Sequence, residues 1–280
     1  MSVRVLDLAS EFLVAVLDAN DRRDGWIRYE RAHSDVFEVY FQNPYWGRRS
    51  GLDEALARLP DVEPQIRRLT AIAPTEAVRV GASVSALLDV TDVDTLCVVF
   101  VGLFGANGFQ DSMRGVPTLF LALERIPDKT ALGVLIAHEV THAFHASLRS
   151  GAWEEDNDIL QAVFSEGLAV HISQLALPGL RLEDYLWMRS PLTVALSQYE
   201  AAFRDGVQEL LGARRMPNHY QRFFNYDSSQ PLDVHPPRFG YYAGMRVLDE
   251  ISRLYPVQSM ARWSSTEAVV ATRNALQAFI

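Results

Sequence analysis

One stretch near the middle of the chain restricts what the rest can fold into: Ala131 to Ser147, with the sequence ALGVLIAHEVTHAFHAS. Its apolar residues recur with a helical period and no proline interrupts them, which predicts an α-helix with Thr130 as its N-cap. His138 and His142 are four residues apart, so in a helix both imidazoles project from one face and can bind one metal ion. The H-E-x-x-H spacing therefore predicts a metal site. Glu139, one step round the helix, is placed to act as a general base without binding the metal.

A catalytic zinc site usually has three protein ligands and leaves a fourth position for water. Glu166 is the best candidate for the third ligand. It is the one carboxylate in a strongly apolar helix predicted over Ile159–Leu177, where a buried charge has to be paired or bound to metal. His145 follows His138 by seven residues, about 10.5 Å along the helix axis, which is too far for one shared ion. Two alternatives stay open: Glu166 lies exposed on a polar face, or His171 is the ligand in its place.

The composition narrows the class of protein. The chain has 280 residues, of which 49% are hydrophobic and 22% charged, as in ordinary soluble globular proteins. Its net charge of −9 argues against nucleic acid as the main partner. The single cysteine, Cys97, lies in an apolar run and is expected to be a buried, unreactive thiol. Acidic residues interrupt the N-terminal apolar positions and the longest apolar run, residues 96–109, is too short for a bilayer, so we expect a cytoplasmic protein that does not enter a membrane.

The predicted secondary structure changes character at residue 91. Residues 1–90 are expected to form a helical N-terminal region with its aromatic side chains in the core. Its helices are predicted at 3–18, 24–41, 51–59, 62–70 and 74–89. Residues 95–104 and 116–123 read as two apolar strands with a turn between them, and Pro117 suits the first residue of a strand or an edge position. The H-E-x-x-H helix follows directly.

The C-terminal part is predicted to be helical again. Further helices are expected at 181–212 in two pieces, at 238–254, and as one or two short helices within 256–280. The irregular stretch 214–236 is long for a loop, and we expect it to cover the site. The fold class is therefore α+β and mostly helical, with a small sheet packed beside the H-E-x-x-H helix.

The motif His138-Glu139-x-x-His142, followed by Ser165-Glu166-Gly167-Leu168-Ala169, resembles the zinc metallopeptidases of the gluzincin type. Within that group it is most similar to uncharacterised families of predicted zinc-dependent proteases. The resemblance covers roughly residues 95–255. It implies a zincin-like metallopeptidase domain over 91–280 and one zinc ion per chain, bound by the two histidines and Glu166. One departure is Val170, at a position where many gluzincins have an aspartate that orients a ligating histidine, so that orienting partner has to come from elsewhere.

A second resemblance lies near the C-terminus. Tyr241-Tyr242-Ala243-Gly244 is similar to the Y-x-x-G of gluzincin aminopeptidases, whose tyrosine donates a hydrogen bond to the oxyanion of the tetrahedral intermediate. The resemblance implies that role for Tyr241, with Tyr242 as the fallback, and His235 could reach the site as a second donor. The residues alone allow a plainer interpretation, in which the tyrosines pack a helix and His235 is a loop histidine.

Together these features predict a zinc-dependent peptidase that hydrolyses peptide bonds in peptides or proteins, with Glu139 as the general base. Two other classes remain: a zinc hydrolase of a non-peptide amide or ester, and a non-catalytic binding module stabilised by zinc. A structural zinc site is closed by four protein ligands, and the presence of Glu139 favours catalysis. The ligands do not exclude another divalent ion, and neither the oligomeric state nor the choice between endo- and exopeptidase is encoded in these motifs.

Overall fold

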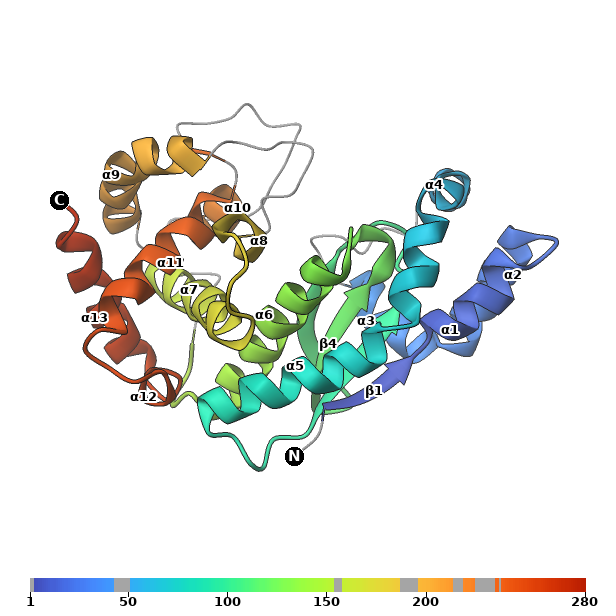
Figure 1. The fold of residues 1–280 in the computed structure, drawn as a ribbon, viewed down its shortest axis with the longest axis horizontal. Coiled ribbons are helices and arrows are strands. Elements are labelled where there is room, and N and C mark those ends of the chain that lie inside the picture. The colour runs from blue at the N-terminus through green and yellow to red at the C-terminus, as the bar shows by residue number, and fades with distance from the viewer. Residues whose placement is uncertain are drawn as a thin grey trace. The chain divides into compact units, whose positions relative to one another are not determined.

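The computed structural model describes residues 3–42, 51–153, 158–186, 196–213, 219–224, 235–236 and 238–280. The chain is mostly helical, with one small mixed sheet (Figure 1). It divides into two compact units, the first formed by Met1–Ser83 with Thr91–Ala143 and the second by Val84–Val90 with Phe144–Ile280. This division differs from the predicted boundary at residue 91. Helices α5 (Ala73–Leu88) and α6 (Lys129–Leu148) both begin in the first unit and end in the second.

The first unit contains a four-stranded sheet in the order β1-β2-β4-β3. The strands are β1 (Val3–Asp7), β2 (Thr95–Phe100), β3 (Gly108–Met113) and β4 (Val116–Ala122). β2 runs parallel to both β1 and β4, whereas β3 is antiparallel to β4 and lies at the edge.

The predicted helix over 3–18 is wrong at its start, because residues 3–7 form β1. The parallel ladder that places Val3 opposite Thr95 satisfies the backbone of this segment in the sheet, and tertiary pairing thereby overrides the local helical period. The chain becomes helical in α1 (Ala9–Phe12) and continues in a π-helical turn, Leu13–Leu17.

The sheet differs from the prediction at two further places. β3 was missed because three successive residues in its middle, Gln110, Asp111 and Ser112, are polar and only partly buried or exposed, so no apolar alternation marks the strand. β4 is an interior strand and Pro117 is its second residue, so this proline is at neither of the two expected positions, the first residue of a strand or an edge. The ladder of β4 with β2 begins at Thr118, so the missing N–H of Pro117 falls outside that ladder and costs it no hydrogen bond.

The other N-terminal helices build an aromatic core against this sheet. They are α2 (Arg22–Ala32), α3 (Ser34–Gln42) and α4 (Leu52–Thr70). The range 24–41 is thus two helices, and α4 is one helix where two were predicted, although Pro60 and Pro64 lie inside it. Leu59 and Ile66 of α4 are fully buried, so core packing outweighs the backbone bonds that the prolines remove. The expected aromatic core is confirmed: it includes Trp26, Tyr29, Phe37 and Tyr40.

The second unit is organised around α7 (Ile159–Ala176), which nearly matches the predicted helix. Residues from Ile159 to Val170 are all buried, as expected for a helix that is apolar on every side. Asp158 caps it by accepting a hydrogen bond from the Leu160 amide at 3.0 Å. The helices α9 (Leu196–Gly212), α11 (Phe239–Ile251) and α13 (Ser265–Gln277) pack against α7, and the short helices α8 (Leu182–Tyr185), α10 (His219–Phe224) and α12 (Val257–Met260) complete the unit.

Candidate metal centre

The H-E-x-x-H motif lies on α6, where the sequence predicted a helix. The helix begins at Lys129, and the capping side chain is Asp128, whose Oδ1 accepts a hydrogen bond from the Ala131 amide at 2.8 Å. The prediction that Thr130 is the N-cap is therefore wrong by two residues, because Thr130 already lies inside the first turn. Lys129 is also held from α5, since the carboxylate of Glu76 lies 3.0 Å from its ammonium group.

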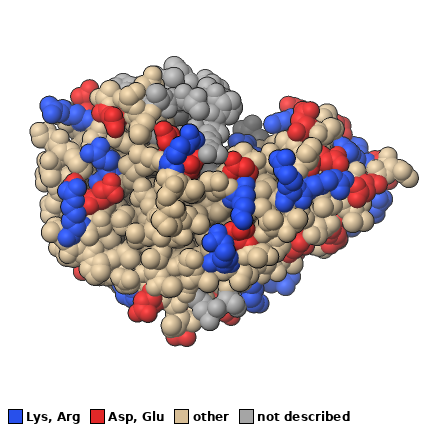
Figure 2. Space-filling view, in the orientation of Figure 1, with Lys and Arg blue, Asp and Glu red and all other residues tan. Residues whose placement is uncertain are grey.

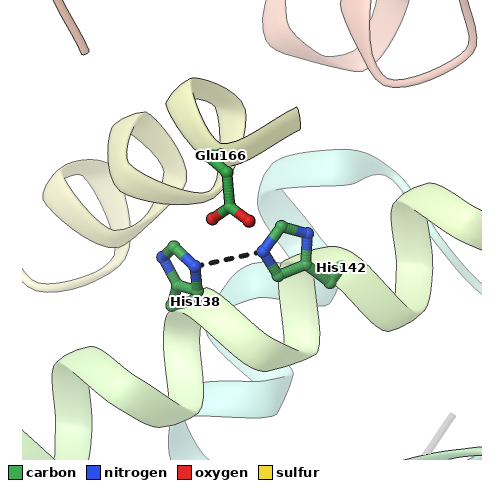
Figure 3. A group of neighbouring side chains, drawn as sticks. All are labelled: His138, His142 and Glu166. Atoms are coloured by element: carbon green, nitrogen blue, oxygen red, sulfur yellow. Dashed lines mark hydrogen bonds between the residues drawn. The ribbon is translucent and has the colours of Figure 1, made fainter. Parts of the chain in front are cut away.

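The structure brings the three predicted ligands together. The Nε2 atoms of His138 and His142 lie 3.0 Å apart. Potential ligand atoms of His138, His142 and Glu166 all lie within 4.8 Å of one another. Figure 3 shows the two imidazole rings on one face of α6, with the carboxylate of Glu166 projecting toward them from α7. The two histidines are half-buried and Glu166 is buried.

These residues fit a divalent metal ion. Two ligand atoms bound about 2.05 Å from a tetrahedral zinc ion would be about 3.3 Å apart, close to the spacing of the two imidazole nitrogens. The donor set of two imidazoles and one carboxylate is one that catalytic zinc sites use. The His138, His142 and Glu166 group can therefore hold a metal ion.

The buried surroundings of Glu166 decide between the alternatives that the sequence left open. Its side chain is 6% exposed, which excludes the exposed, polar-face interpretation. His171 does not belong to the group, and burial lowers the pKa of its imidazole. His145 is also outside the group: its buried ring packs edge-on against Trp153 with the ring centres 4.9 Å apart. These placements agree with the expected ligand set.

Glu139 is buried, with an exposed fraction of 8%, and precedes the fully buried Val140 on α6. It directly follows His138 in the chain and is not a member of the ligand group. Its role as a general base remains a prediction.

The three secondary candidates lie in the second unit, among aromatic side chains. Tyr241 is half-buried, and the guanidinium of Arg238 lies 4.4 Å from the centre of its ring. Tyr242 is 1% exposed, and its hydroxyl accepts a hydrogen bond from Arg246 at 3.0 Å. The ring of His235 stacks on Phe239, with its Nε2 2.5 Å from a carboxylate oxygen of Glu209. 

These contacts give Tyr242 and His235 structural partners, as the plainer interpretation expects, and the role of Tyr241 stays a prediction. The loop expected to cover the site falls largely on residues 214–218 and 225–234, which lie outside the described residues.

A further buried carboxylate, Glu124, was not predicted from the sequence, and it lies two residues after the end of β4. It is 3% exposed and accepts hydrogen bonds from the amides of Gly102 and Phe104 at 2.9 and 2.8 Å. Burial raises the pKa of Glu124 to about 7, against the lowering effect of these hydrogen bonds and of Arg125. The signal that could have revealed it is a charged residue directly after an uninterrupted apolar run, Leu119–Leu123. Cys97 is buried as expected, and burial raises the pKa of its thiol.

No protein-family model matches the chain, and neither a curated protein nor a solved structure does. Within the described ranges, none of the helices is both long enough and apolar enough to span a bilayer. On the face drawn in Figure 2, acidic and basic side chains of the described residues are interspersed rather than gathered into one broad region of a single sign.

Proposed function

We propose that this protein is a zinc-dependent peptidase. The observation that carries the proposal is the grouping of His138, His142 and Glu166, whose ligand atoms lie within 4.8 Å of one another. Two imidazoles and a carboxylate leave a zinc ion one open position, whereas a structural zinc site is usually closed by four protein ligands. The fit to the gluzincin motif described above supports the same assignment.

In the proposed reaction each residue has a separate task. His138, His142 and Glu166 hold the metal, which when bound polarises a carbonyl group and lowers the pKa of water to about 7. Glu139 accepts the proton of the attacking water and delivers it to the amide nitrogen as the C–N bond breaks. Tyr241 donates a hydrogen bond to the carbonyl oxygen as negative charge develops there.

The preference for a peptide substrate is supported by the edge strand β3. Among the described residues β3 pairs only with β4, so its other edge has backbone groups to which an extended peptide can add as a further strand. The strand also lies against the motif helix: a Cβ atom placed on Gly108 would be 2.9 Å from a methyl carbon of Leu135, one turn before His138. A peptide held along β3 would thus pass close to α6.

The test combines a metal assay with a substrate screen. Purified protein, loaded with zinc and dialysed, is expected to hold one zinc ion per chain and to cleave denatured casein or a mixed peptide library. Glu139→Gln should lower the cleavage rate by at least about a thousandfold and leave the zinc content unchanged, because the glutamine cannot accept a proton. Glu54→Gln, at an exposed position of α4, is the matched control and should cleave normally.

The outcomes separate the three classes of function. A Glu139→Gln variant with full activity would remove Glu139 from the reaction. Zinc binding with hydrolysis of small esters or amides but not of peptides would identify a non-peptide hydrolase instead. Stoichiometric zinc with no hydrolysis of any of these substrates would favour a zinc-stabilised binding module.

A further inference from the structure

Two glycines mark the closest approach of α7 and α11 in the second unit. A Cβ atom on Gly244 of α11 would lie 2.6 Å from the carbonyl oxygen of Val163 and 2.8 Å from the amide nitrogen of Gly167. A Cβ atom on Gly167 would in turn overlap the carbonyl group of Gly244, and it would lie 2.8 Å from Cδ2 of Leu248. The two backbones are therefore in direct contact, and no other residue type fits at either position.

This contact lies on the same turn of α7 as Glu166. Glu166 directly precedes Gly167, and Val163 lies one turn before Gly167 on α7. Because the overlapping atoms belong to the backbone, they cannot move aside as a side chain could. An added methyl group would have to push the two helices apart by roughly 1 Å to restore ordinary van der Waals separation. Metal–ligand distances tolerate only about 0.2 Å.

We propose that Gly167 and Gly244 are positioning residues, which set the separation of α7 and α11 and thereby place the Glu166 carboxylate within reach of the metal. The inference rests on the proposed zinc centre. It also assigns a structural task to Gly244, the glycine of the Y-x-x-G sequence: its missing side chain allows α11 to touch α7 beside the metal ligand.

The experiment measures zinc affinity by competition with a chelating dye, using the apoprotein and zinc alone. Gly244→Ala and Gly167→Ala are each expected to weaken zinc binding by at least about tenfold, the effect typical of losing a group that orients a ligand. With cobalt(II) in place of zinc, the visible absorption of both variants should shift toward that of Glu166→Ala. Gly25→Ala is the matched control, because its Cβ would overlap the carbonyl oxygen of Ala15 in the first unit. It should lose thermal stability yet retain zinc affinity and the cobalt spectrum.

If Gly167→Ala and Gly244→Ala do not fold, a third variant, Leu248→Ala, tests the positioning role instead. Leu248→Ala loosens the same contact by removing the side chain that faces Gly167, and should weaken zinc binding at least about threefold. Leu59→Ala, at a fully buried position of α4, is its control for cavity formation and should retain zinc affinity.

Normal zinc affinity in folded Gly244→Ala and Gly167→Ala, or in Leu248→Ala, would overturn the positioning role while the zinc centre stands. Failure of the wild-type protein to bind zinc would instead overturn the proposed function. The two failures are therefore distinguishable.

Discussion

Glu124 is a buried carboxylate with a structural task. It accepts two amide hydrogen bonds from the segment after β2, and that segment contains two successive non-glycine residues with left-handed backbones, Leu103 (φ 56°) and Phe104 (φ 67°). Such conformations are uncommon for bulky side chains and persist only where neighbouring groups hold them. The Glu124 carboxylate and Arg125, which donates to the carbonyl oxygen of Phe104 at 2.8 Å, supply those holding contacts.

Glu124 should make the protein less stable as the pH rises. Its pKa is about 7 in the folded protein and about 4.5 in an unfolded chain, so between these values only the folded state keeps the proton. The contribution of this group to the free energy of unfolding is therefore highest below pH 4.5 and falls by up to about 3 kcal/mol as the pH passes 7. Glu124→Gln retains an acceptor oxygen and cannot ionise, so its stability should lack this decline.

Urea denaturation of both proteins at pH 5 and pH 8 measures the difference. The wild-type protein should lose stability relative to Glu124→Gln at the higher pH. Parallel behaviour of the two proteins would show that Glu124 does not titrate in this range.

At the scale of single elements, the start of α6 offers a direct comparison of two neighbouring side chains. Asp128→Ala removes the acceptor for the Ala131 amide and should cost about 1 kcal/mol of stability. Thr130→Ala, inside the first turn, should be neutral or slightly stabilising because alanine has the higher helix propensity. Thermal unfolding of the two variants checks this. A larger loss in Thr130→Ala than in Asp128→Ala would return the capping role to Thr130.

The elements most easily predicted from the sequence were those with a single strong pattern. α6 and α7 were placed within two residues at each end, because a long apolar helix has no competing interpretation. β1 was missed because its residues fit a helical period equally well, and its strand conformation depends on pairing with a segment ninety residues away. The edge strand β3 was missed because its solvent-facing residues are polar.

The residues of the candidate site also differ in how well the sequence predicts them. His138, Glu139 and His142 follow from spacing within one helix, and Glu166 follows from the cost of burying an unpaired carboxylate. The surroundings of Tyr241 depend on how α11 packs against α7 and α10. This packing includes the backbone contact between Gly167 and Gly244 and the contact of the Phe224 ring with Tyr241. No local sequence pattern predicts such contacts between helices. 

For the whole molecule, metal binding should be visible as thermal stabilisation. Zinc at about a hundred times its dissociation constant would add about 2.7 kcal/mol to the free energy of unfolding, which corresponds to roughly 5–10 °C in Tm for a chain of this size. Treatment with EDTA should lower Tm by that amount, and zinc should restore it. His142→Ala should be insensitive to both treatments, whereas His171→Ala should respond as the wild-type protein does. If the Tm of His171→Ala did not change with EDTA and zinc while that of His142→Ala did, His171 would replace His142 as a proposed metal ligand.

The parallel pairing of β1 with β2 also has a consequence for how the protein is made. Val3 lies opposite Thr95, so the first strand leaves the ribosome long before its partner has been synthesised. Helices α2 to α5 emerge in the interval, and β1 has to wait, unpaired, while they form. During translation the unpaired backbone groups of β1 can form β-sheet hydrogen bonds with other chains. They become protected only when the nascent chain includes β2.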